Sequence, residues 1–438
     1  MDLKVVKFGG SSLSEAQQFK KVAEIVRAEA SRRYVVPSAP GKRNDSDDKV
    51  TDLLYSCYDK VVRGEDMSEI FERIKQRYND IIIGLSLNLS LELEFKKIES
   101  GFVNKAGRDY AASRGEYLNG IILACYLEYD FVDASEVIFF NEDGSFNADK
   151  TQVIMREALL KHKNAVIPGF YGVMPNDTIK TFSRGGSDIT GSLVARAVDA
   201  DLYENWTDIA GICMADPRIV PNPKTITTIT YRELRELSYM GFSVLHEDAT
   251  FPVRIAGIPI AIKNTNDPDA PGTMIVAYTK DLSSEHTITG VAGKKGFSVI
   301  TLEKDMMNAE LGFVKRTLEV LENHGISFEH LPSGIDTMSI VVNESSISSK
   351  KDTIFAQLHE KVDPDSIEFQ SALSLIAVVG RGMIRTKGTA ARVFDAIARA
   401  GINIRMIDQG SSELNIIIGV NDGDFENAIK AIYKEFVK

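Results

Sequence analysis

Residues 5–14 read VVKFGGSSLS, and this stretch gives the first indication of the fold. Leu3–Phe8 has the pattern of a short buried strand, and two glycines follow it directly. Beyond Ser14, apolar residues recur at three- and four-residue steps, which predicts a helix. Gln17 stands three residues after Ser14, as in a capping box that opens a helix. The stretch therefore predicts a strand, a glycine turn and a helix.

The polar turn between this strand and helix has two interpretations. Gly9 and Gly10 can simply reverse the direction of the chain. Alternatively, they leave backbone N–H groups free to approach an anion at the start of the helix, with Lys7 supplying positive charge. The sequence around them is neither GxxxxGK[ST] nor GxGxxG, which excludes the two common nucleotide-binding fingerprints.

The alternation of strand and helix continues along the chain. A strand is predicted at Tyr34–Val36, before PSAPGK and a polar loop at 41–49. Helices are predicted at 151–162, before the strand AVIPGF, and at 186–199, before the strand DLYENW. Residues 65–100 have a mostly helical pattern, but IIIGLSLNLSLELEF alternates like a strand, and both readings stay open. This order predicts an α/β fold, a mostly parallel sheet with helices on both faces.

The composition restricts the class of partner and the compartment. The chain has 438 residues and a net charge of −11, which disfavours nucleic acid as the main partner. It starts without the apolar segment of a signal peptide and has no apolar run long enough to span a membrane. Cys57, Cys125 and Cys213 form no CxxC, and the six histidines are scattered. We therefore expect a cytoplasmic protein without a protein-built metal site.

The C-terminal part contains an internal repeat. GFVKRTLEVLENHGISFEHL begins at Gly312, and GTAARVFDAIARAGINIRMI begins at Gly388, 76 positions later. Each copy has the pattern strand, helix, strand, strand, helix, and Gly325 and Gly401 fit helix C-caps. Two small α+β modules are therefore predicted after the larger α/β domain.

Three further motifs carry candidate chemistry. In SRGGSDITGS, residues 183–192, Arg184 offers a planar fork suited to a carboxylate, and Asp188 can hold an ammonium group or a metal. In WTDIAGICMADPR, residues 206–218, polar side chains follow the end of a predicted strand, where ligands bind in open α/β sheets. In RGEYLNG, Glu116 lies at the start of a helical run.

KFGGSS, SRGGSD, TDIAGICMADPR and the C-terminal repeat, in this order over essentially the whole chain, resemble the aspartate kinase (aspartokinase) family. The resemblance implies an amino-acid kinase fold followed by two ferredoxin-like ACT domains. The catalytic domain would span residues 1–286, and the ACT regions would span 287–370 and 371–438. The ACT modules can be tandem or interleaved, and in the interleaved version 288–303 would pair with 373–438.

The resemblance also implies roles for individual residues in transfer of phosphate from ATP to aspartate. Lys7, Arg184 and Asp188 would be catalytic: Lys7 would stabilise the transferred phosphoryl group, and Asp188 would orient Lys7. The residues expected at the nucleotide are Lys7, Gly9, Gly10, Ser11, Ser38, Thr207, Asp208, Cys213, Arg218, Asn266 and Asp267. The residues expected at aspartate are Thr51, Glu116, Arg184, Gly185, Gly186 and Ser187, with Glu116 binding the ammonium group. Mg²⁺ would be held mainly through the ATP phosphates.

Regulation is likewise implied by the resemblance, through an amino acid bound at the ACT domains. The candidate effector residues are Met307, Gly312, Phe313, Val314, Phe328, Glu329 and Ser333, and lysine is expected in preference to threonine. In the alternative interpretation, Phe313 and Phe328 are core residues and Glu329 is solvated. A homodimer or homotetramer would form through the ACT domains. The other functions considered are a non-catalytic amino-acid sensor and a kinase for glutamate or N-acetylglutamate.

Overall fold

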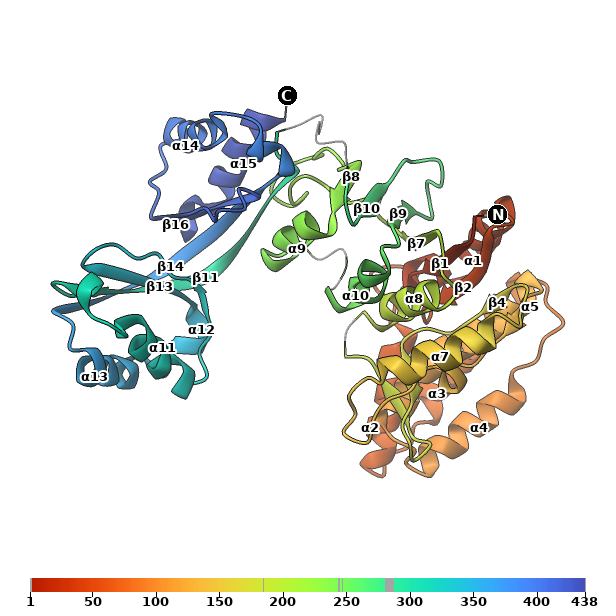
Figure 1. Cartoon of the computed structure of the whole chain (residues 1–438). Coiled ribbons are helices and arrows are strands. Elements are labelled where there is room, and N and C mark those ends of the chain that lie inside the picture. The colour runs from red at the N-terminus through yellow and green to blue at the C-terminus, as the bar shows by residue number, and fades with distance from the viewer. Residues whose placement is uncertain (1, 184, 243–244, 246, 280–286, 438) are drawn as a thin grey trace. The chain divides into compact units, whose positions relative to one another are not determined.

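The computed structural model describes residues 2–183, 185–242, 245, 247–279 and 287–437, which form two compact units (Figure 1). The first unit comprises Met1–Ile212, Thr225–Arg232 and Ser243–Thr279. The second comprises Cys213–Lys224, Glu233–Phe242 and Lys280–Lys438. The boundary expected at residue 286 falls in 280–286, outside the described residues, so the domain limits stay predictions.

The first unit is built on a sheet whose strands are nearly all parallel. Within the described residues it has eight strands in the order β3-β4-β2-β1-β7-β9-β10-β8, and only the β9–β10 pair is antiparallel. The strands are β1 (Lys4–Phe8), β2 (Arg32–Pro37), β3 (Asp130–Phe131), β4 (Ala165–Val166), β7 (Leu202–Thr207), β8 (Thr228–Thr230), β9 (Ile260–Asn264) and β10 (Thr273–Val276). The prediction of a mostly parallel sheet is confirmed.

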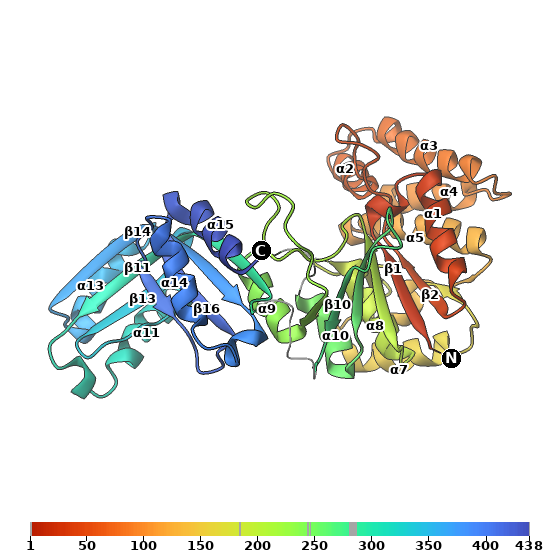
Figure 2. The ribbon, with the colours of Figure 1, turned by 90° about the horizontal axis from the view of Figure 1, so that it is seen from above.

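Helices cover both faces of this sheet (Figure 2). One group contains the 3₁₀ turn η1 (Gly10–Leu13), α1 (Ala16–Ala28), α2 (Val50–Val62), α3 (Ser68–Gly84), α4 (Glu92–Val103) and α5 (Arg108–Leu127). The other contains α7 (Ala148–Leu159), α8 (Gly186–Ala197) and α10 (Glu247–Ala256). The short helix α6 (Ala134–Val137) and the antiparallel pair β5 (Tyr171–Val173) and β6 (Ile179–Thr181) complete the unit.

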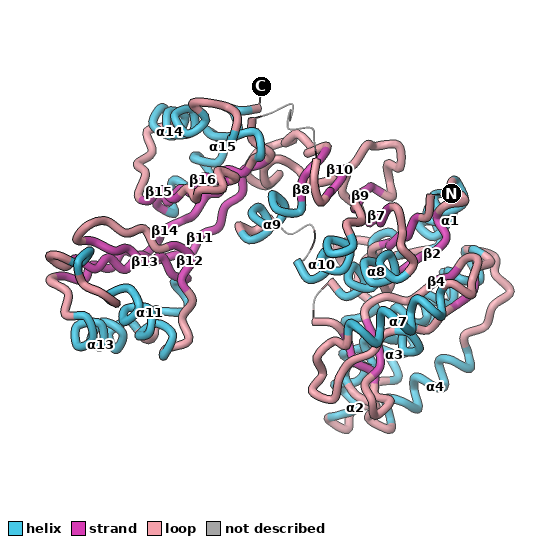
Figure 3. Tube along the Cα trace, viewed as in Figure 1, coloured by secondary structure: helices cyan, strands magenta, loops and turns pink. Residues whose placement is uncertain are grey.

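Two local expectations are settled by these elements. The capping box at Ser14 is wrong, because η1 intervenes and α1 begins at Ala16, with Glu15 at its N-cap and no side-chain cap bond. The ambiguous alternating run is not a strand: it forms the end of α3, a connection and the start of α4 (Figure 3). Tertiary packing decides this case, since Ile81, Ile82 and Phe95 are buried in the core beside the sheet.

The second unit contains a six-stranded antiparallel sheet within the described residues, in the order β12-β13-β11-β14-β16-β15. Its strands are β11 (Gly290–Glu303), β12 (Phe328–His330), β13 (Thr337–Asn343), β14 (Ser366–Val379), β15 (Met406–Asp408) and β16 (Asn415–Asn421). Its helices and 3₁₀ turns are η2 (Met307–Ala309), α11 (Phe313–Asn323), α12 (Glu344–Ile347), α13 (Lys351–Val362), η3 (Arg381–Ile384), α14 (Thr389–Arg399), η4 (Asp422–Asp424) and α15 (Phe425–Phe436). Most of α9 (Tyr231–Tyr239) also belongs here.

The two copies of the repeat share the long central strands of this sheet. Residues 290–294 of β11 pair with 375–379 of β14, whereas 297–303 pair with 366–373. The repeat is visible in backbone detail as well. Gly312 and Gly388 occupy the N-caps of α11 and α14 with φ of 82° and 83°, a left-handed conformation in which glycine is favoured. We call the copy with α11 and α13 the first module and the copy with α14 and α15 the second.

Among the described residues, no helix combines the length and the apolar character that crossing a membrane requires.

Candidate active site

In the first unit, the side chains of Lys7, Asp188 and Asn205 interact with one another. The ammonium Nζ of Lys7 is 2.6 Å from Oδ1 of Asp188 and donates to Oδ1 of Asn205 at 3.4 Å. Asn205 in turn donates from Nδ2 to the same Asp188 oxygen at 2.8 Å. Lys7 is 7% exposed and Asn205 is 4% exposed, so the positive charge is held in a fixed position with little access to water.

Neighbouring elements explain why these three side chains meet. β1 and β7 are adjacent parallel strands, and their register places Lys7 directly beside Asn205. Asp188 lies in the first turn of α8, where a carboxylate is favoured by the helix dipole. The start of α8 packs closely, since a Cβ on Gly186 would lie 2.5 Å from the Phe170 ring. A side chain at position 186 would therefore force a shift at the start of α8, the turn that carries Asp188.

The glycine turn after β1 is in direct backbone contact with the turn that follows β2. A Cβ added to Gly10 would lie 2.9 Å from the carbonyl oxygen of Ala39, and one on Gly41 would lie 2.6 Å from the Gly10 carbonyl carbon. The Gly41 N–H donates to the Gly10 oxygen at 2.8 Å, and the Gly9 N–H donates to the Trp206 oxygen at 3.0 Å. Side chains are excluded here because the two backbones are in contact.

Glu116 on α5 is a buried carboxyl group next to this second turn. It is 6% exposed, and it accepts a hydrogen bond from the backbone N–H of Ala39. Burial raises the pKa of Glu116 to about 8. Its Oε2 atom has no hydrogen-bond partner among the described residues. Among the described residues this carboxyl group forms no ion pair, and the charge of Arg114 only partly offsets the effect of burial on its pKa.

The helical turn of Glu116 also carries contacts to two other residues of the predicted site. Asn119, three residues further on, donates from Nδ2 to the backbone oxygen of Ser38 at 2.6 Å. A Cβ on Gly115 would lie 2.8 Å from the Ala39 side chain and 3.8 Å from the Thr51 hydroxyl. The structure thus brings Ser38 and Thr51 next to α5, in contact with the turn that closes on Gly10.

The remaining residues predicted in the first unit are placed as follows. Ser11 is half-buried in η1, Gly185 is the exposed N-cap of α8, and Ser187 is buried against Gly169. Thr207 ends β7 and donates to exposed Asp208 at 3.1 Å. Asn266 and Asp267 are exposed after β9, and Asn266 accepts from Lys21 at 2.8 Å. Arg184 lies outside the described residues, so its carboxylate-binding role stays a prediction.

Cys213 and Arg218 belong to the second unit, unlike the other predicted nucleotide residues. Cys213 is half-buried, and burial raises the pKa of its thiol. The exposed Arg218 guanidinium binds Asp216 with both Nε and Nη2, and this pair lowers the pKa of Asp216. Within the described residues, no group of three or more His, Cys, Asp or Glu side chains could hold a metal ion.

The candidate effector residues divide between core and surface. Phe313 and Met307 are buried in the core of the first module, whereas Phe328 is 45% exposed and Val314 is 38% exposed. Gly312 caps α11, and Ser333 bridges to Met338. For Phe313, the structure agrees with the core alternative.

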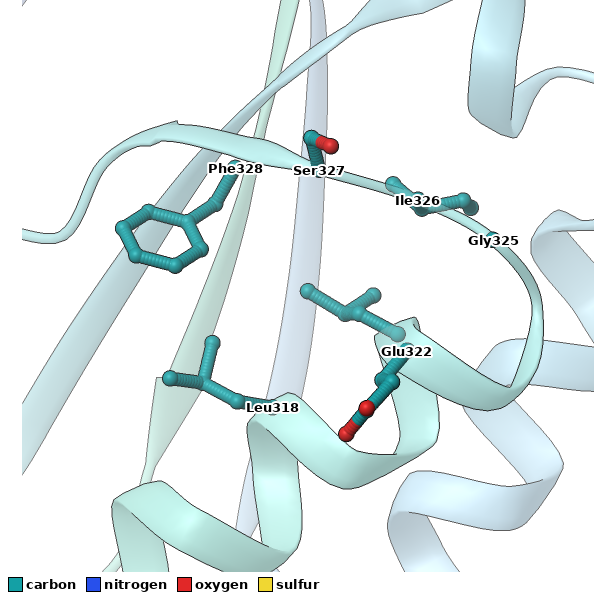
Figure 4. Close-up of a pocket in the computed structure, with 7 residues that line it drawn as sticks. Leu318, Glu322, Gly325, Ile326, Ser327 and Phe328 are labelled. Atoms are coloured by element: carbon teal, nitrogen blue, oxygen red, sulfur yellow. The ribbon is translucent and has the colours of Figure 1, made fainter. Parts of the chain in front are cut away.

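A pocket of about 580 Å³ lies between α11 and the segment that leads into β12 (Figure 4). Of the candidate effector residues, only Phe328 lines it, and Figure 4 shows the Leu318 side chain rising from α11 toward Phe328. Glu329 is not a solvated side chain without contacts, because the Tyr239 hydroxyl at the end of α9 donates to its Oε2 atom.

Asn205 is the functional candidate that the sequence did not reveal. It stands inside DLYENW, a strand that is buried at Tyr203–Trp206. A buried asparagine on a central strand can indicate a polar site. Its partners Lys7 and Asp188, however, lie on other elements, so the sequence alone does not show the contact. Asn119 was missed for the same reason, since the contact with Ser38 joins residues 81 positions apart.

Comparisons with known proteins identify the family of the chain. Residues 2–264 match the model of the amino acid kinase family, and residues 376–436 match an ACT domain. The chain is 38% identical to aspartokinase 3 of Bacillus subtilis over 452 residues, covering 99% of this chain and 98% of that protein. It is 27% identical to aspartokinase 1 of Arabidopsis thaliana, covering 99% and 80%.

Solved structures give the same result. The aspartate kinase of Clostridium acetobutylicum, described as an allosteric enzyme, is 51% identical and superimposes with a TM-score of 0.92 over 99% of this chain and 100% of that one. Escherichia coli aspartokinase III in complex with aspartate and ADP has a TM-score of 0.74 at 24% identity, covering 99% of both chains, which shows the shared fold. The chain therefore belongs to the amino acid kinase family, and within it to the aspartate kinases that carry a C-terminal ACT domain. The predicted fold class is confirmed.

Proposed function

We propose that this aspartate kinase transfers the γ-phosphoryl group of ATP to the β-carboxylate of L-aspartate at the site around Lys7 and Glu116. The observation that carries the proposal is the contact between the two glycine turns, which joins a fixed lysine to a buried carboxyl group whose Oε2 atom has no hydrogen-bond partner among the described residues. Escherichia coli aspartokinase III has structures in complex with aspartate and ADP and in complex with lysine and aspartate, which supports the same ligand classes here.

In this mechanism the acceptor is already a carboxylate, so catalysis consists of positioning and charge neutralisation rather than proton removal. Lys7 would stabilise the charge that develops on the phosphoryl oxygens, with Asp188 and Asn205 fixing its ammonium group. The turn at Gly9, Gly10 and Ser11 would cradle phosphate through backbone N–H groups beyond Gly9, because the Gly9 N–H already donates to the Trp206 oxygen.

Aspartate would be held by groups of complementary charge. Glu116 would pair with the ammonium group, and Arg184 would bind a carboxylate, with Gly185, Gly186 and Ser187 forming the start of α8 beside it. Thr51 would contact the same substrate. ATP would be contacted by Ser11, Ser38 and the residues after β7 and β9, with Cys213 and Arg218 as further candidates.

Mg²⁺ would be bound mainly through the ATP phosphates. The donor set fits this role: Asp188 already pairs with Lys7, which leaves the nucleotide as the main source of anionic oxygens. When bound, the ion would supply additional neutralisation of phosphate charge.

Regulation by an amino acid, with lysine preferred to threonine, is proposed at the first module. Glu329 supports this because its carboxylate could bind an effector ammonium in place of the Tyr239 hydroxyl. The pairing of residues 290–294 with 375–379 supports the interleaved arrangement of the modules. The reaction would be the first step of lysine, threonine and methionine biosynthesis, in the cytoplasm.

A homodimer or homotetramer through the ACT modules is proposed as well. β12 is an edge strand of the six-stranded sheet, so its outer side has no ladder partner among the described residues. Exposed Phe328 and the pocket beside it place apolar surface next to this edge. Light scattering with and without lysine would measure the assembly.

The deciding experiment is a coupled assay of ADP release by the pure protein with ATP and Mg²⁺. We expect release with aspartate, little with glutamate, and inhibition by lysine. No aspartate-dependent release would refute the kinase function. Arg184→Ala should weaken aspartate use far more than ATP use, and an equal loss for both substrates would contradict its role at the carboxylate.

A further inference from the structure

Asn119 is a fully buried amide whose interactions are incomplete. Its exposed fraction is 0%, and its Nδ2 donates to the Ser38 oxygen at 2.6 Å. Its Oδ1 atom has no hydrogen-bond partner within the part of the chain that the structure describes. A buried acceptor without a donor costs free energy, roughly 1–3 kcal/mol, so its persistence at this position calls for a ligand or a function.

The neighbour of Asn119 on the same helix face has the same property. Glu116 lies three residues earlier, and side chains at that spacing are neighbours on a helix surface. Its Oε2 is likewise unpartnered among the residues described. One turn of α5 therefore presents two buried acceptors without donors, one carboxyl and one neutral amide.

Glu116 and Asn119 each form a hydrogen bond with the same backbone peptide group. Glu116 accepts from the N–H of Ala39, and Asn119 donates to the C=O of Ser38, which are the two ends of the same peptide unit. This peptide leads into the turn that contacts Gly10. The peptide is held from both ends, so the orientation of the two spare acceptors is fixed relative to the glycine turn.

The ligand that fits two unpartnered acceptors is a donor with several N–H groups and positive charge. A primary ammonium group has three N–H donors and no acceptor. The Glu116 carboxylate would supply the negative charge that balances the ammonium group. The neutral Asn119 oxygen would orient a second N–H group without adding another buried negative charge.

We propose that Asn119 is a second substrate-binding residue of this site, whose Oδ1 accepts a hydrogen bond from the ammonium group of the amino-acid substrate while its Nδ2 positions the Ser38–Ala39 peptide. The inference rests on the proposed function, since it deepens the binding of aspartate at Glu116. It makes the amino group, and not only the two carboxylates, a determinant of substrate choice.

The test compares aspartate with succinate, which has both carboxylates but no amino group. Asn119→Leu removes both polar atoms at similar volume, and Asn119→Asp keeps an acceptor in place. Asn104→Leu, at an exposed asparagine, is the control. For each protein one measures the KM for aspartate and for ATP, kcat, the inhibition constant of succinate and the Kd of aspartate by calorimetry with ADP and Mg²⁺ present.

For Asn119→Leu we expect the Kd and KM of aspartate to rise about tenfold, as for loss of one hydrogen bond to a charged group. The succinate inhibition constant should change less than threefold, and Asn119→Asp should keep the wild-type preference for aspartate over succinate. Equal weakening of both ligands in Asn119→Leu would show a purely structural role and overturn the proposal, as would unchanged binding of aspartate. If Asn119→Leu does not fold, loss of the preference in folded Asn119→Asp overturns it.

These results are separable from failure of the proposed function. Wild-type protein that binds aspartate without releasing ADP would refute the kinase activity and leave the comparison of aspartate with succinate intact. Wild-type protein that binds neither ligand would overturn both.

Discussion

Lys7 on β1 and Glu116 on α5 are both buried ionisable side chains, yet they differ in how many hydrogen-bonding partners surround them. Lys7 has two polar partners, Asp188 and Asn205, so its charge is paired without any ligand. Glu116 has backbone donors alone and an unpartnered oxygen among the described residues. The comparison indicates that one end of the site is preorganised by the protein, whereas the other is completed by the substrate.

The largest effect is expected at the preorganised end. Lys7→Met should lower kcat by about 10²–10³-fold, because the transferred phosphoryl group would lose a fixed positive charge. The KM for aspartate should change little. The coupled assay measures both, and Lys20→Met, at an exposed lysine of α1, is the matched control. A loss confined to substrate affinity would contradict the assignment of Lys7 to the phosphoryl group.

Glu116→Gln should produce the complementary result at the other end. The neutral amide cannot balance an ammonium charge, so the KM for aspartate should rise by about ten- to a hundredfold, with a small change in the KM for ATP. Steady-state kinetics with each substrate varied in turn provides the measurement. Glu94→Gln on α4 is a control at a carboxylate that already has Lys97 and Tyr117 as partners. If aspartate and ATP were affected equally, the substrate would not be what completes Glu116.

The two ends should also differ in their contributions to stability. Asp188→Asn should lower the free energy of unfolding by about 1–3 kcal/mol, because Lys7 would remain buried without its counter-charge. Glu116→Gln should instead stabilise the ligand-free protein at high pH. Thermal midpoints between pH 5 and pH 9 measure both effects.

The sign at Glu116 follows from its raised pKa. Folding moves the pKa of Glu116 from its ordinary value of 4.5 to about 8, so the folded protein retains a proton that the unfolded chain releases between these values. Stability from this group is therefore complete below about pH 4.5 and falls as pH rises toward about 8. The advantage of Glu116→Gln should grow over this window, and a constant difference across pH would show that Glu116 is not buried as described.

The smallest effect is expected in the regulatory part. Tyr239→Phe removes the hydroxyl that donates to Glu329 and should lower the lysine concentration for half-inhibition by about fivefold, because an exposed hydrogen bond contributes only about 1 kcal/mol. The uninhibited kcat should not change. Inhibition curves for wild type and variant provide the comparison, and a rise in the half-inhibition concentration would mean that Tyr239 helps to bind the effector rather than competing with it.

The sequence predicted the parts of the site that carry local patterns. KFGGSS and SRGGSD each join glycines to a charged residue at a helix start, and RGEYLNG places Glu116 on a helix, so these candidates were found without knowledge of the fold. Asn205 and Asn119 carry no local pattern. Their roles depend on strand register and on a contact between α5 and the turn after β2, which form only when distant segments pack.

The same limit explains the errors outside the site. The capping box at Ser14 fitted the sequence, but the 3₁₀ turn after Gly9 moved the helix start to Ala16. The alternating run after Ile81 matched a strand locally, yet burial against the core favoured helices on both sides of a short connection. Local propensity is a weak guide where tertiary packing decides.

The most direct test of the central claim is the proton balance of aspartate binding. Calorimetric titrations at pH 7 in buffers of different ionisation enthalpy, with ADP and Mg²⁺ present, give the number of protons released per aspartate bound. Because Glu116 has a pKa of about 8 in the free protein and must ionise to pair with the ammonium group, we predict release of close to one proton by wild type and none by Glu116→Gln. Equal proton release by the two proteins would contradict the account.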